Sequence, residues 1–315
     1  MPPPGAYPPA EVTITPALVR SLLAEQHPDL SHLPLGASFE GWDNLTTRLG
    51  ASLAVRMPRL AAAVPLLERE RSWLPRLSEG WTFGAPVPVR EGRPGGDYPW
   101  PWSVVPWFDG DDASVAPLSP AGARELGRAL REVHVPADPS APTTPWRTTP
   151  LASRRAETET QLDSLDELAA REGLDWRGEE ARSLWRAAAA LPWAASHWVH
   201  ADLPIKTVVT RRGSLAAILD WGEAGAGDPA QDLGQVWLMC GPDDAKAALA
   251  AYGTAAREVI DGETLTRARG EALVTAVRHI ATGDPGFVAA AWRALVSLCV
   301  AAGPGPWAQP PRAGG

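Results

Sequence analysis

Cysteine and lysine are scarce in this chain, and each scarcity narrows its possible roles. The 315 residues include two cysteines, Cys240 and Cys299, which lie far apart in apolar segments. They offer neither a disulfide framework nor the ligand spacing of a zinc site, so we expect two buried thiols. Lysine occurs only at Lys206 and Lys246, so the basic charge rests almost entirely on arginine.

Long apolar runs and excess positive charge are also missing. No apolar run reaches the ~18 residues of a membrane span, and the N-terminus lacks the basic and apolar regions of a signal peptide. We therefore expect a cytoplasmic protein with no membrane partner. The net charge of −8 and pI near 5.3 argue against nucleic acid as a partner. An acidic chain suits a cationic small molecule better, and the sequence leaves the oligomeric state open.

The first 107 residues predict a lobe rich in β-strands. Thr15 is a plausible N-cap for a helix over 15–25, and Leu66, Leu67, Leu74 and Leu77 follow helical spacing in a second helix over 61–77. Alternating or apolar runs bounded by turn residues predict the strands. They cover residues 39–44, 46–50, 52–57, 86–89 and 102–108.

Residues 108–315 predict a mainly helical lobe. Ser119 can cap a helix over 119–134, and further helices are expected at 152–171, at 177–190 and over most of 230–301. Short strands are expected at 198–200, 207–210 and 215–219. The whole chain therefore predicts an α+β fold of two lobes, with domains at 1–107 and 108–315.

Three acidic motifs follow one another between residues 198 and 233. They read His200-Ala-Asp202-Leu-Pro-Ile-Lys206-Thr207, then Leu219-Asp220-Trp-Gly, then Gly227-Asp228-Pro-Ala-Gln-Asp232-Leu. Apolar strands before the first two motifs would place two carboxylates on neighbouring loops at one sheet edge. Phosphoryl transfer uses such a pair, one carboxylate to accept a proton from the attacking hydroxyl and one to hold magnesium.

These motifs resemble the aminoglycoside phosphotransferase family, a relative of the protein kinases. That family carries His-Gly-Asp-x-x-x-x-Asn, then Ile-Asp-Phe/Trp-Gly, then Gly-Asp-Pro-x-x-Asp-Leu. The resemblance implies that Asp202 is the catalytic base and Asp220 the main magnesium ligand. It also implies that His200 braces the catalytic loop, that Asp228 shapes a turn and that Asp232 hydrogen-bonds the loop backbone. A single aspartate of this kind would more simply be a solvated turn residue.

The first lobe carries further points of resemblance. Gly-Trp-Asp-Asn at 41–44 and Val-Arg-Met-Pro at 55–58 resemble the family's nucleotide-covering hairpin and third strand. Arg56 then stands where protein kinases have lysine and would bind the α- and β-phosphates of ATP or GTP, with Glu70 positioning it. A surface ion pair is the alternative. The segment 98–107 resembles the hinge between lobes, although we expect most of its tryptophans to pack in the core.

The catalytic loop departs from the family, because Leu203-Pro-Ile-Lys206 stands where the family has Leu-His-Pro-Gly and the residue after it also differs. Thr207 replaces the magnesium-binding asparagine, and Lys206 replaces the glycine before it. A threonine hydroxyl can bind magnesium, but it is shorter than an asparagine amide. Lys206 either contacts a phosphate in place of the second metal ion or points to solvent.

Two functions remain open at this stage. The resemblance implies a kinase that transfers the γ-phosphoryl group of ATP or GTP, with Mg²⁺, to a hydroxyl of an antibiotic or natural-product intermediate. Alternatively, the altered loop has lost phosphotransfer, and the protein is a binding module or an enzyme of another reaction class. Acidic residues in the last helices could attract a cationic acceptor, although a solvated helical face explains them more simply. They are Asp243, Asp244, Glu258, Asp261 and Glu263.

Overall fold

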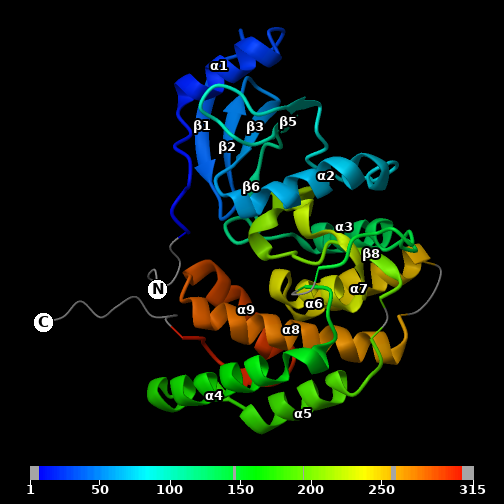
Figure 1. The fold of residues 1–315 in the computed structure, drawn as a ribbon. Coiled ribbons are helices and arrows are strands. Elements are labelled where there is room, and N and C mark those ends of the chain that lie inside the picture. Colours follow the sequence, from blue (N-terminus) through cyan, green and yellow to red (C-terminus); the bar gives the residue numbers. More distant parts are fainter. Residues whose placement is uncertain (1–6, 145–146, 194, 257–259, 307–315) are drawn as a thin grey trace, which may run out of the picture. The chain divides into compact units, whose positions relative to one another are not determined.

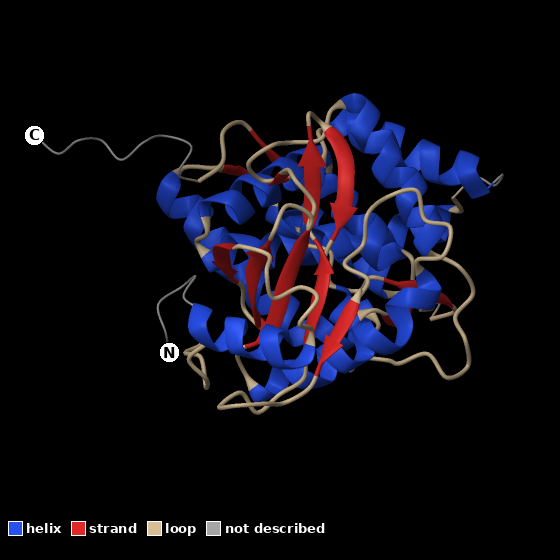
Figure 2. Ribbon diagram, turned by 90° about the horizontal axis from the view of Figure 1, so that it is seen from above, coloured by secondary structure: helices blue, strands red, loops and turns tan. Residues whose placement is uncertain are grey.

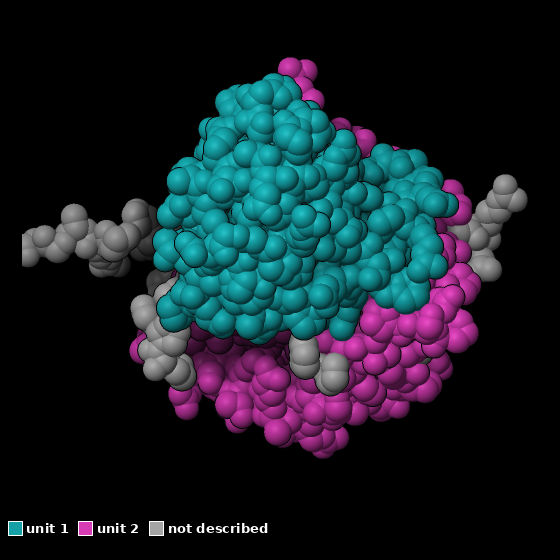
Figure 3. Space-filling model, turned by 45° about the horizontal axis from the view of Figure 1, so that its top comes forward, with its two compact units in different colours: residues 1–109, 217–223 teal, residues 110–216, 224–315 magenta. Residues whose placement is uncertain are grey.

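The computed structural model describes residues 7–144, 147–193, 195–256 and 260–306. The chain forms two compact units (Figures 1 and 3). Unit 1 comprises residues 1–109 and 217–223, and unit 2 comprises 110–216 and 224–315. Unit 1 contains a five-stranded sheet and unit 2 contains long helices, which confirms the predicted α+β class.

Unit 1 is built on an antiparallel sheet in the order β1-β2-β3-β5-β4. Its strands are β1 (Leu35–Glu40), β2 (Asn44–Leu49), β3 (Leu53–Pro58), β4 (Arg90–Gly92) and β5 (Trp102–Pro106). The predicted hairpin tip falls between β1 and β2, where the Gly41 N–H donates to the Asn44 carbonyl. This hairpin turn sets the register of the first two strands.

Two helices accompany this sheet. α1 (Pro16–Gln26) buries Val19, Leu22 and Leu23 in one core with sheet residues that include Val55 and Trp102. Thr15 caps α1, because its hydroxyl accepts the Leu18 N–H at 3.2 Å. The second predicted helix begins as a 3₁₀ turn, η1 (Ala61–Ala63), and continues as α2 (Val64–Leu77).

The strand predicted at residues 86–89 is wrong, because the edge strand β4 begins only at Arg90. Pro86 and Pro88 have no N–H to donate to a strand ladder, which keeps this segment out of the sheet. The tryptophan-rich segment that follows packs as expected. Tyr98 and Trp102 are buried, and Trp100 packs against the same core.

Unit 2 is organised around the long helix α8 (Gly262–Thr282), which contacts α4, α5, α6 and α9. A second pair of helices, α3 and α7, also packs together. Gly127 of α3 allows this close approach, because a Cβ atom on residue 127 would lie 2.0 Å from the Ala248 carbonyl oxygen of α7. Ser119 caps α3 as predicted. The other bounds are α3 (Pro120–Val133), η2 (Leu151–Arg154), α4 (Arg155–Glu172), α5 (Gly178–Ala189), α6 (Ala230–Met239), α7 (Pro242–Ala256) and α9 (Pro285–Ser297).

Figure 2 draws all the strands in red; the short ones described next lie before and after the acidic motifs in the sequence. β8 (His197–Val199) precedes the first motif and pairs with β11 (Gly225–Gly227), while η3 (Ile205–Thr207) leads into β9 (Val208–Arg211). β9 lies between β6 (Asp111–Asp112) and β10 (Ser214–Ile218), and η4 (Trp221–Glu223) follows β10. A small pair not predicted from the sequence joins β7 (Asp175–Trp176) to β12 (Ala301–Ala302).

The two cysteines differ in environment. Cys240 is buried as expected, and burial raises the pKa of its thiol to about 12. Cys299 is exposed, so that expectation was wrong. It follows α9 with a φ of 65°, between buried Leu298 and Val300. In the described part of the chain, no helix has the length and hydropathy to cross a bilayer.

Candidate functional site

The loop of the first motif is held by Asp232 of α6. The carboxylate of Asp232 accepts the N–H of His200 at 2.6 Å and the N–H of Ala201 at 3.0 Å. Ala201 has a φ of 67°, a left-handed conformation that costs a residue with a side chain about 1–2 kcal/mol. The family motif has glycine at this position, so the two hydrogen bonds hold a turn that Ala201 alone disfavours.

A buried histidine completes this support. His134, at the C-terminus of α3, places Nε2 3.1 Å from Asp232 Oδ2, and both side chains are almost fully buried. Burial opposes ionisation of Asp232, but the hydrogen bonds and charges of His134 and His200 lower its pKa overall. His134 lies outside the motifs and was not identified from the sequence.

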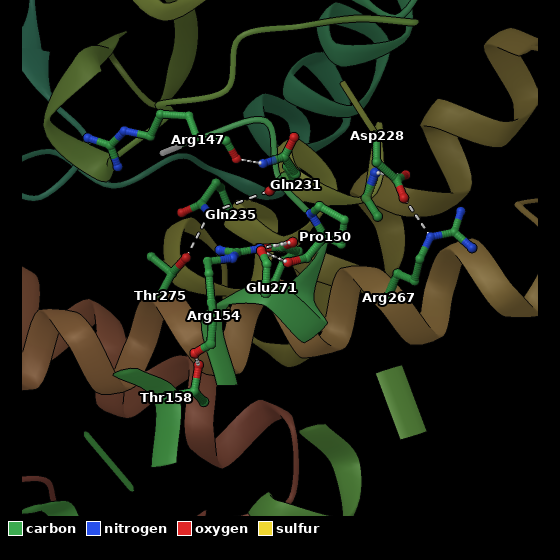
Figure 4. A network of polar contacts seen from close by, with 12 residues as sticks. Arg147, Pro150, Arg154, Thr158, Asp228, Gln231, Gln235, Arg267, Glu271 and Thr275 are labelled. Atoms are coloured by element: carbon green, nitrogen blue, oxygen red, sulfur yellow. Dashed lines mark hydrogen bonds and ion pairs between the residues drawn. The ribbon is translucent and has the colours of Figure 1, made fainter. Parts of the chain in front are cut away.

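Asp228 also has structural partners. Its carboxylate accepts the Ala230 N–H at 3.0 Å, at the start of α6, and the Arg267 Nε–H at 2.6 Å (Figure 4). Arg267 belongs to α8, so this ion pair ties the turn before α6 to the central helix. The contacts fit the turn-shaping role that the resemblance implies.

Asp202, the predicted base, has an arginine partner that the motifs do not contain. Arg147 Nη2 donates to Asp202 Oδ2 at 2.7 Å, and both side chains are about a quarter exposed. The Gln231 amide of α6 donates to the Arg147 carbonyl (Figure 4). Unit 2 thus presents a carboxylate whose orientation is fixed by a guanidinium and, through its loop, by Asp232.

Lys206 and Thr207 follow on the same loop. The Lys206 ammonium forms a 2.7 Å ion pair with Asp284 and lies 4.5 Å from the centre of the Phe287 ring. Thr207 donates its hydroxyl hydrogen to the Pro204 carbonyl at 2.8 Å. Lys206 is therefore anchored to the start of α9, which neither sequence alternative anticipated.

Unit 1 brings together Arg56, Glu70 and Asp220. Arg56 Nη1 donates to both carboxylate oxygens of Glu70, at 2.6 and 2.5 Å, and its Nη2 donates to Asp220 Oδ1 at 2.7 Å. Burial disfavours the charged guanidinium, but Glu70 and Asp220 outweigh it and raise the pKa of Arg56. The Glu70 side chain is 0% exposed and that of Asp220 is 47% exposed. This is a buried network with one solvent-facing carboxylate, not a surface ion pair.

The second motif shapes this network. Asp220 has a φ of 67°, which aspartate tolerates better than most residues. The next N–H, that of Trp221, donates to Glu70 at 3.2 Å, and the buried Trp221 ring packs 4.6 Å from the Trp81 ring. A Cβ at Gly222 would lie 2.8 Å from Leu66 Cβ of α2, so glycine lets η4 sit against that helix. The Asp-Trp-Gly sequence thus has a packing reason at each position.

The acids suit a magnesium ion that enters with a nucleotide. Among the described residues, no group of three His, Cys, Asp or Glu side chains could hold a metal ion. Mg²⁺ commonly takes only one or two protein carboxylates and fills its remaining positions with phosphate oxygens and water. The half-exposed Asp220, with Oδ1 held by Arg56, fits that pattern.

A polar pocket opens beside Asp202 within unit 2, and we call it the Asp202 pocket. The loop 201–204, α6 and α8 line it, with Gln231 and Gln235 on α6 and Glu271, Thr275 and Arg278 on α8. The acids proposed for a cationic acceptor are not among its lining residues. Asp243, Asp261 and Glu263 are exposed, Asp244 is partly exposed, and Glu258 lies outside the described residues.

Comparison with known proteins gives the family. The family model described as "Phosphotransferase enzyme family" matches residues 30–272. The chain resembles the GDP complex of an aminoglycoside 2'-phosphotransferase-IIIa, with 17% identity, 90% of this chain and 98% of that chain covered, and a TM-score of 0.60. It also resembles macrolide 2'-phosphotransferase MphH from Brachybacterium faecium (19% identity, 88% and 97% covered, TM-score 0.56).

A third similar structure is the streptomycin-ATP-APH(2")-IIa ternary complex, with 17% identity, 86% and 94% covered and a TM-score of 0.55. No curated protein sequence matches the chain. At these identities the solved structures establish a shared kinase-like fold, while the family model spans most of the sequence. The chain therefore belongs to the phosphotransferase enzyme family, the aminoglycoside phosphotransferase family that its motifs resemble, and is by family a small-molecule phosphotransferase.

Proposed function

We propose that the protein transfers the γ-phosphoryl group of ATP or GTP to a hydroxyl of a small molecule, an antibiotic or a natural-product intermediate. The Arg56–Glu70–Asp220 network carries this proposal, because it places a permanently charged guanidinium next to a solvent-facing carboxylate. Structural relatives were solved with GDP and kanamycin and with ATP and streptomycin. The cytoplasm, where ATP and GTP are available, is the expected location.

In unit 1, Arg56 binds the α- and β-phosphates through its forked N–H donors, and Glu70 fixes the direction of that fork. Asp220 holds magnesium, which when bound neutralises charge on the β- and γ-phosphates. Arg56 fixes one Asp220 oxygen through its Nη2 contact and so orients the carboxylate that would hold the ion.

In unit 2, Asp202 accepts the proton of the acceptor hydroxyl as that oxygen bonds to the γ-phosphorus and the bond to the β-phosphate oxygen breaks. His200, Asp228 and Asp232 act through the loop backbone and the turn before α6. Thr207 can offer its hydroxyl oxygen as a second metal ligand, because that group donates its hydrogen elsewhere. Lys206 must leave Asp284 before it can contact a phosphate.

One observation favours the alternative, a kinase-like protein without phosphotransfer. Arg147 occupies Asp202 Oδ2, and a carboxylate paired with a guanidinium is a weaker base than a free one. Combined with the missing asparagine at Thr207, this arrangement suits a binding module or a different reaction class. Nucleotide binding and turnover distinguish the two proposals.

The test begins with heat unfolding in the presence of Mg-ATP and Mg-GTP. A nucleotide at 100 times its Kd should add about 2.7 kcal/mol of stability. Nucleotide consumption is then measured over a panel of hydroxylated antibiotics, with the product identified by its mass. Asp202→Asn should lower turnover by about 10²–10⁴-fold without changing stability much, because it removes the general base but keeps the shape.

The exposed Asp243→Asn serves as a matched control and should behave as wild type. Full turnover by the Asp202→Asn variant would remove Asp202 from the role of base. Absence of any stabilisation or consumption with either nucleotide would leave only the alternative function.

A further inference from the structure

Among the described residues, Arg278 is the charged side chain of the Asp202 pocket that has no hydrogen bond or ion pair, although Asp202 and Glu157 act on it electrostatically. It lies on α8 and is half-buried. Within the described ranges of the chain it has no hydrogen-bond or ion-pair partner. An arginine carries five N–H donors in a planar fork, and a half-buried guanidinium without an acceptor is costly. The position therefore points to a ligand that supplies the missing acceptors.

The other ionised groups around the pocket are already paired. Arg147 contacts Asp202, and Arg154 forms an ion pair with Glu271 (Figure 4). The carboxylate of Asp232 accepts hydrogen bonds from the N–H groups of His200 and Ala201 and lies within hydrogen-bond distance of His134. The carboxylates that line the pocket thus have hydrogen-bond partners, whereas Arg278 has no hydrogen bond or ion pair among the described residues.

Unpaired buried polar atoms also line the pocket, among them the Oε1 atom of Gln231. The Nε atoms of Arg147 and Arg154 are buried without a partner. Burial, followed by the like charge of Arg147, lowers the pKa of Arg278; Asp202 opposes this shift and Arg154 adds to it, so a negative ligand would further offset the cost of burying this charge. Burial and the neighbouring arginines also lower the pKa of His279 to about 3, which leaves this lining residue neutral at ordinary pH.

We propose that the acceptor of this phosphotransferase carries an oxyanion, a carboxylate or a phosphate, which Arg278 binds while the acceptor hydroxyl faces Asp202. The inference rests on the proposed function and specifies its substrate class. It reverses the expectation drawn from net charge, because recognition follows the groups in the pocket and the acids of the last helices lie elsewhere. A guanidinium fork matches two oxygens of either anion.

The experiment compares wild type, Arg278→Gln, Arg278→Lys and a control, Arg211→Gln. Arg211 is exposed at the end of β9, so its variant removes one charge away from the pocket. Heat unfolding is followed in sodium acetate, sodium phosphate and sodium chloride at equal ionic strength. We expect acetate or phosphate to raise the melting temperature of wild type and of Arg211→Gln above the chloride value, and Arg278→Gln to lose that shift.

Turnover is then measured with matched acceptors: glucuronate, glucose 6-phosphate, glucose and glucosamine, followed by hydroxylated antibiotics as acids and as their amides. Within the sugars, and within each acid and amide pair of antibiotics, we expect the acidic compound to have the highest kcat/KM. Arg278→Gln should lower its kcat/KM about 10- to 100-fold, with the nucleotide KM unchanged and partial recovery in Arg278→Lys. Two comparisons show whether the site prefers a carboxylate or a phosphate. The first is acetate against phosphate in heat unfolding, and the second is glucuronate against glucose 6-phosphate in turnover.

Three results would overturn the inference. They are equal anion shifts in wild type and Arg278→Gln, no shift above chloride in wild type, or turnover confined to neutral and amine acceptors. In the last case Mg-ATP or Mg-GTP is still consumed, so the proposed function survives. If neither nucleotide binds any variant while acetate binding still requires Arg278, the phosphotransfer proposal fails, and the acceptor role fails with it.

Discussion

Replacing Glu70 by alanine tests whether the Arg56 network holds unit 1 together as well as serving a nucleotide. Glu70 lies on α2 and accepts two hydrogen bonds from Arg56 and one from the Trp221 N–H. Its side chain is fully buried, so these hydrogen bonds are made inside the protein and not at its surface. Both Arg56 and Trp221 would lose an acceptor.

The expected loss of stability can be worked from these contacts. Removal of one partner from a buried ion pair costs about 3–5 kcal/mol, because the other charge is left uncompensated. Arg56 keeps its 2.7 Å contact with Asp220, which is half exposed, so we expect a value of about 3 kcal/mol. The loss of a fixed guanidinium should also lower kcat/KM for the nucleotide on the order of 10²-fold.

Urea unfolding followed by tryptophan fluorescence measures the stability change, and nucleotide-dependent turnover measures the second effect. Glu68→Ala is the matched control, since Glu68 is exposed on the same helix, and should change stability by no more than about 0.5 kcal/mol. If Glu70→Ala were as stable as Glu68→Ala, Glu70 would not compensate a buried charge, and the reasoning about Arg56 would be wrong.

Three further changes probe other parts of the site. Thr207→Asn should preserve or raise magnesium-dependent turnover, because the longer amide restores a metal ligand; a large loss would show that the loop serves other chemistry. Ala201→Gly should raise the free energy of unfolding by about 1 kcal/mol or less, since relief of the positive φ exceeds the added chain entropy; urea unfolding decides. The folded-state pKa of His279 is lowered to about 3, so its contribution is complete above the unfolded value near 6.5 and falls as pH falls below it. His279→Gln should therefore lose about 2 kcal/mol less than wild type between pH 7 and pH 5, and identical pH profiles would contradict that pKa.

Much of the fold was predictable because its signals are local. Thr15 and Ser119 cap helices where the sequence places them, since a hydroxyl before a helix satisfies free N–H groups without help from distant residues. The family could be identified because the three acidic motifs occur in the right order. The pairing of Arg56 with Glu70 followed from that resemblance, and the structure contains it.

The remainder depends on contacts between distant residues. Arg147 and Asp202 form an ion pair although they lie 55 positions apart in the sequence. The residues next to each of them give no indication of this contact. The role proposed for Arg278 rests on the residues around it in the Asp202 pocket, and no sequence motif contains that information. The prediction for Cys299 was wrong for a similar reason: its apolar neighbours in the sequence suggested burial, but the folded chain leaves its side chain exposed.

Residues 217–223 complete unit 1 although they follow it by about a hundred residues. On a ribosome that adds roughly 5–20 residues per second, the first 109 residues wait several seconds or longer for Asp220 and Trp221 to emerge. Until then Arg56 has only Glu70, and the α2 surface that receives Gly222 stays uncovered. A fragment ending at residue 109 would lack residues 217–223, so we expect that it does not form the complete unit 1.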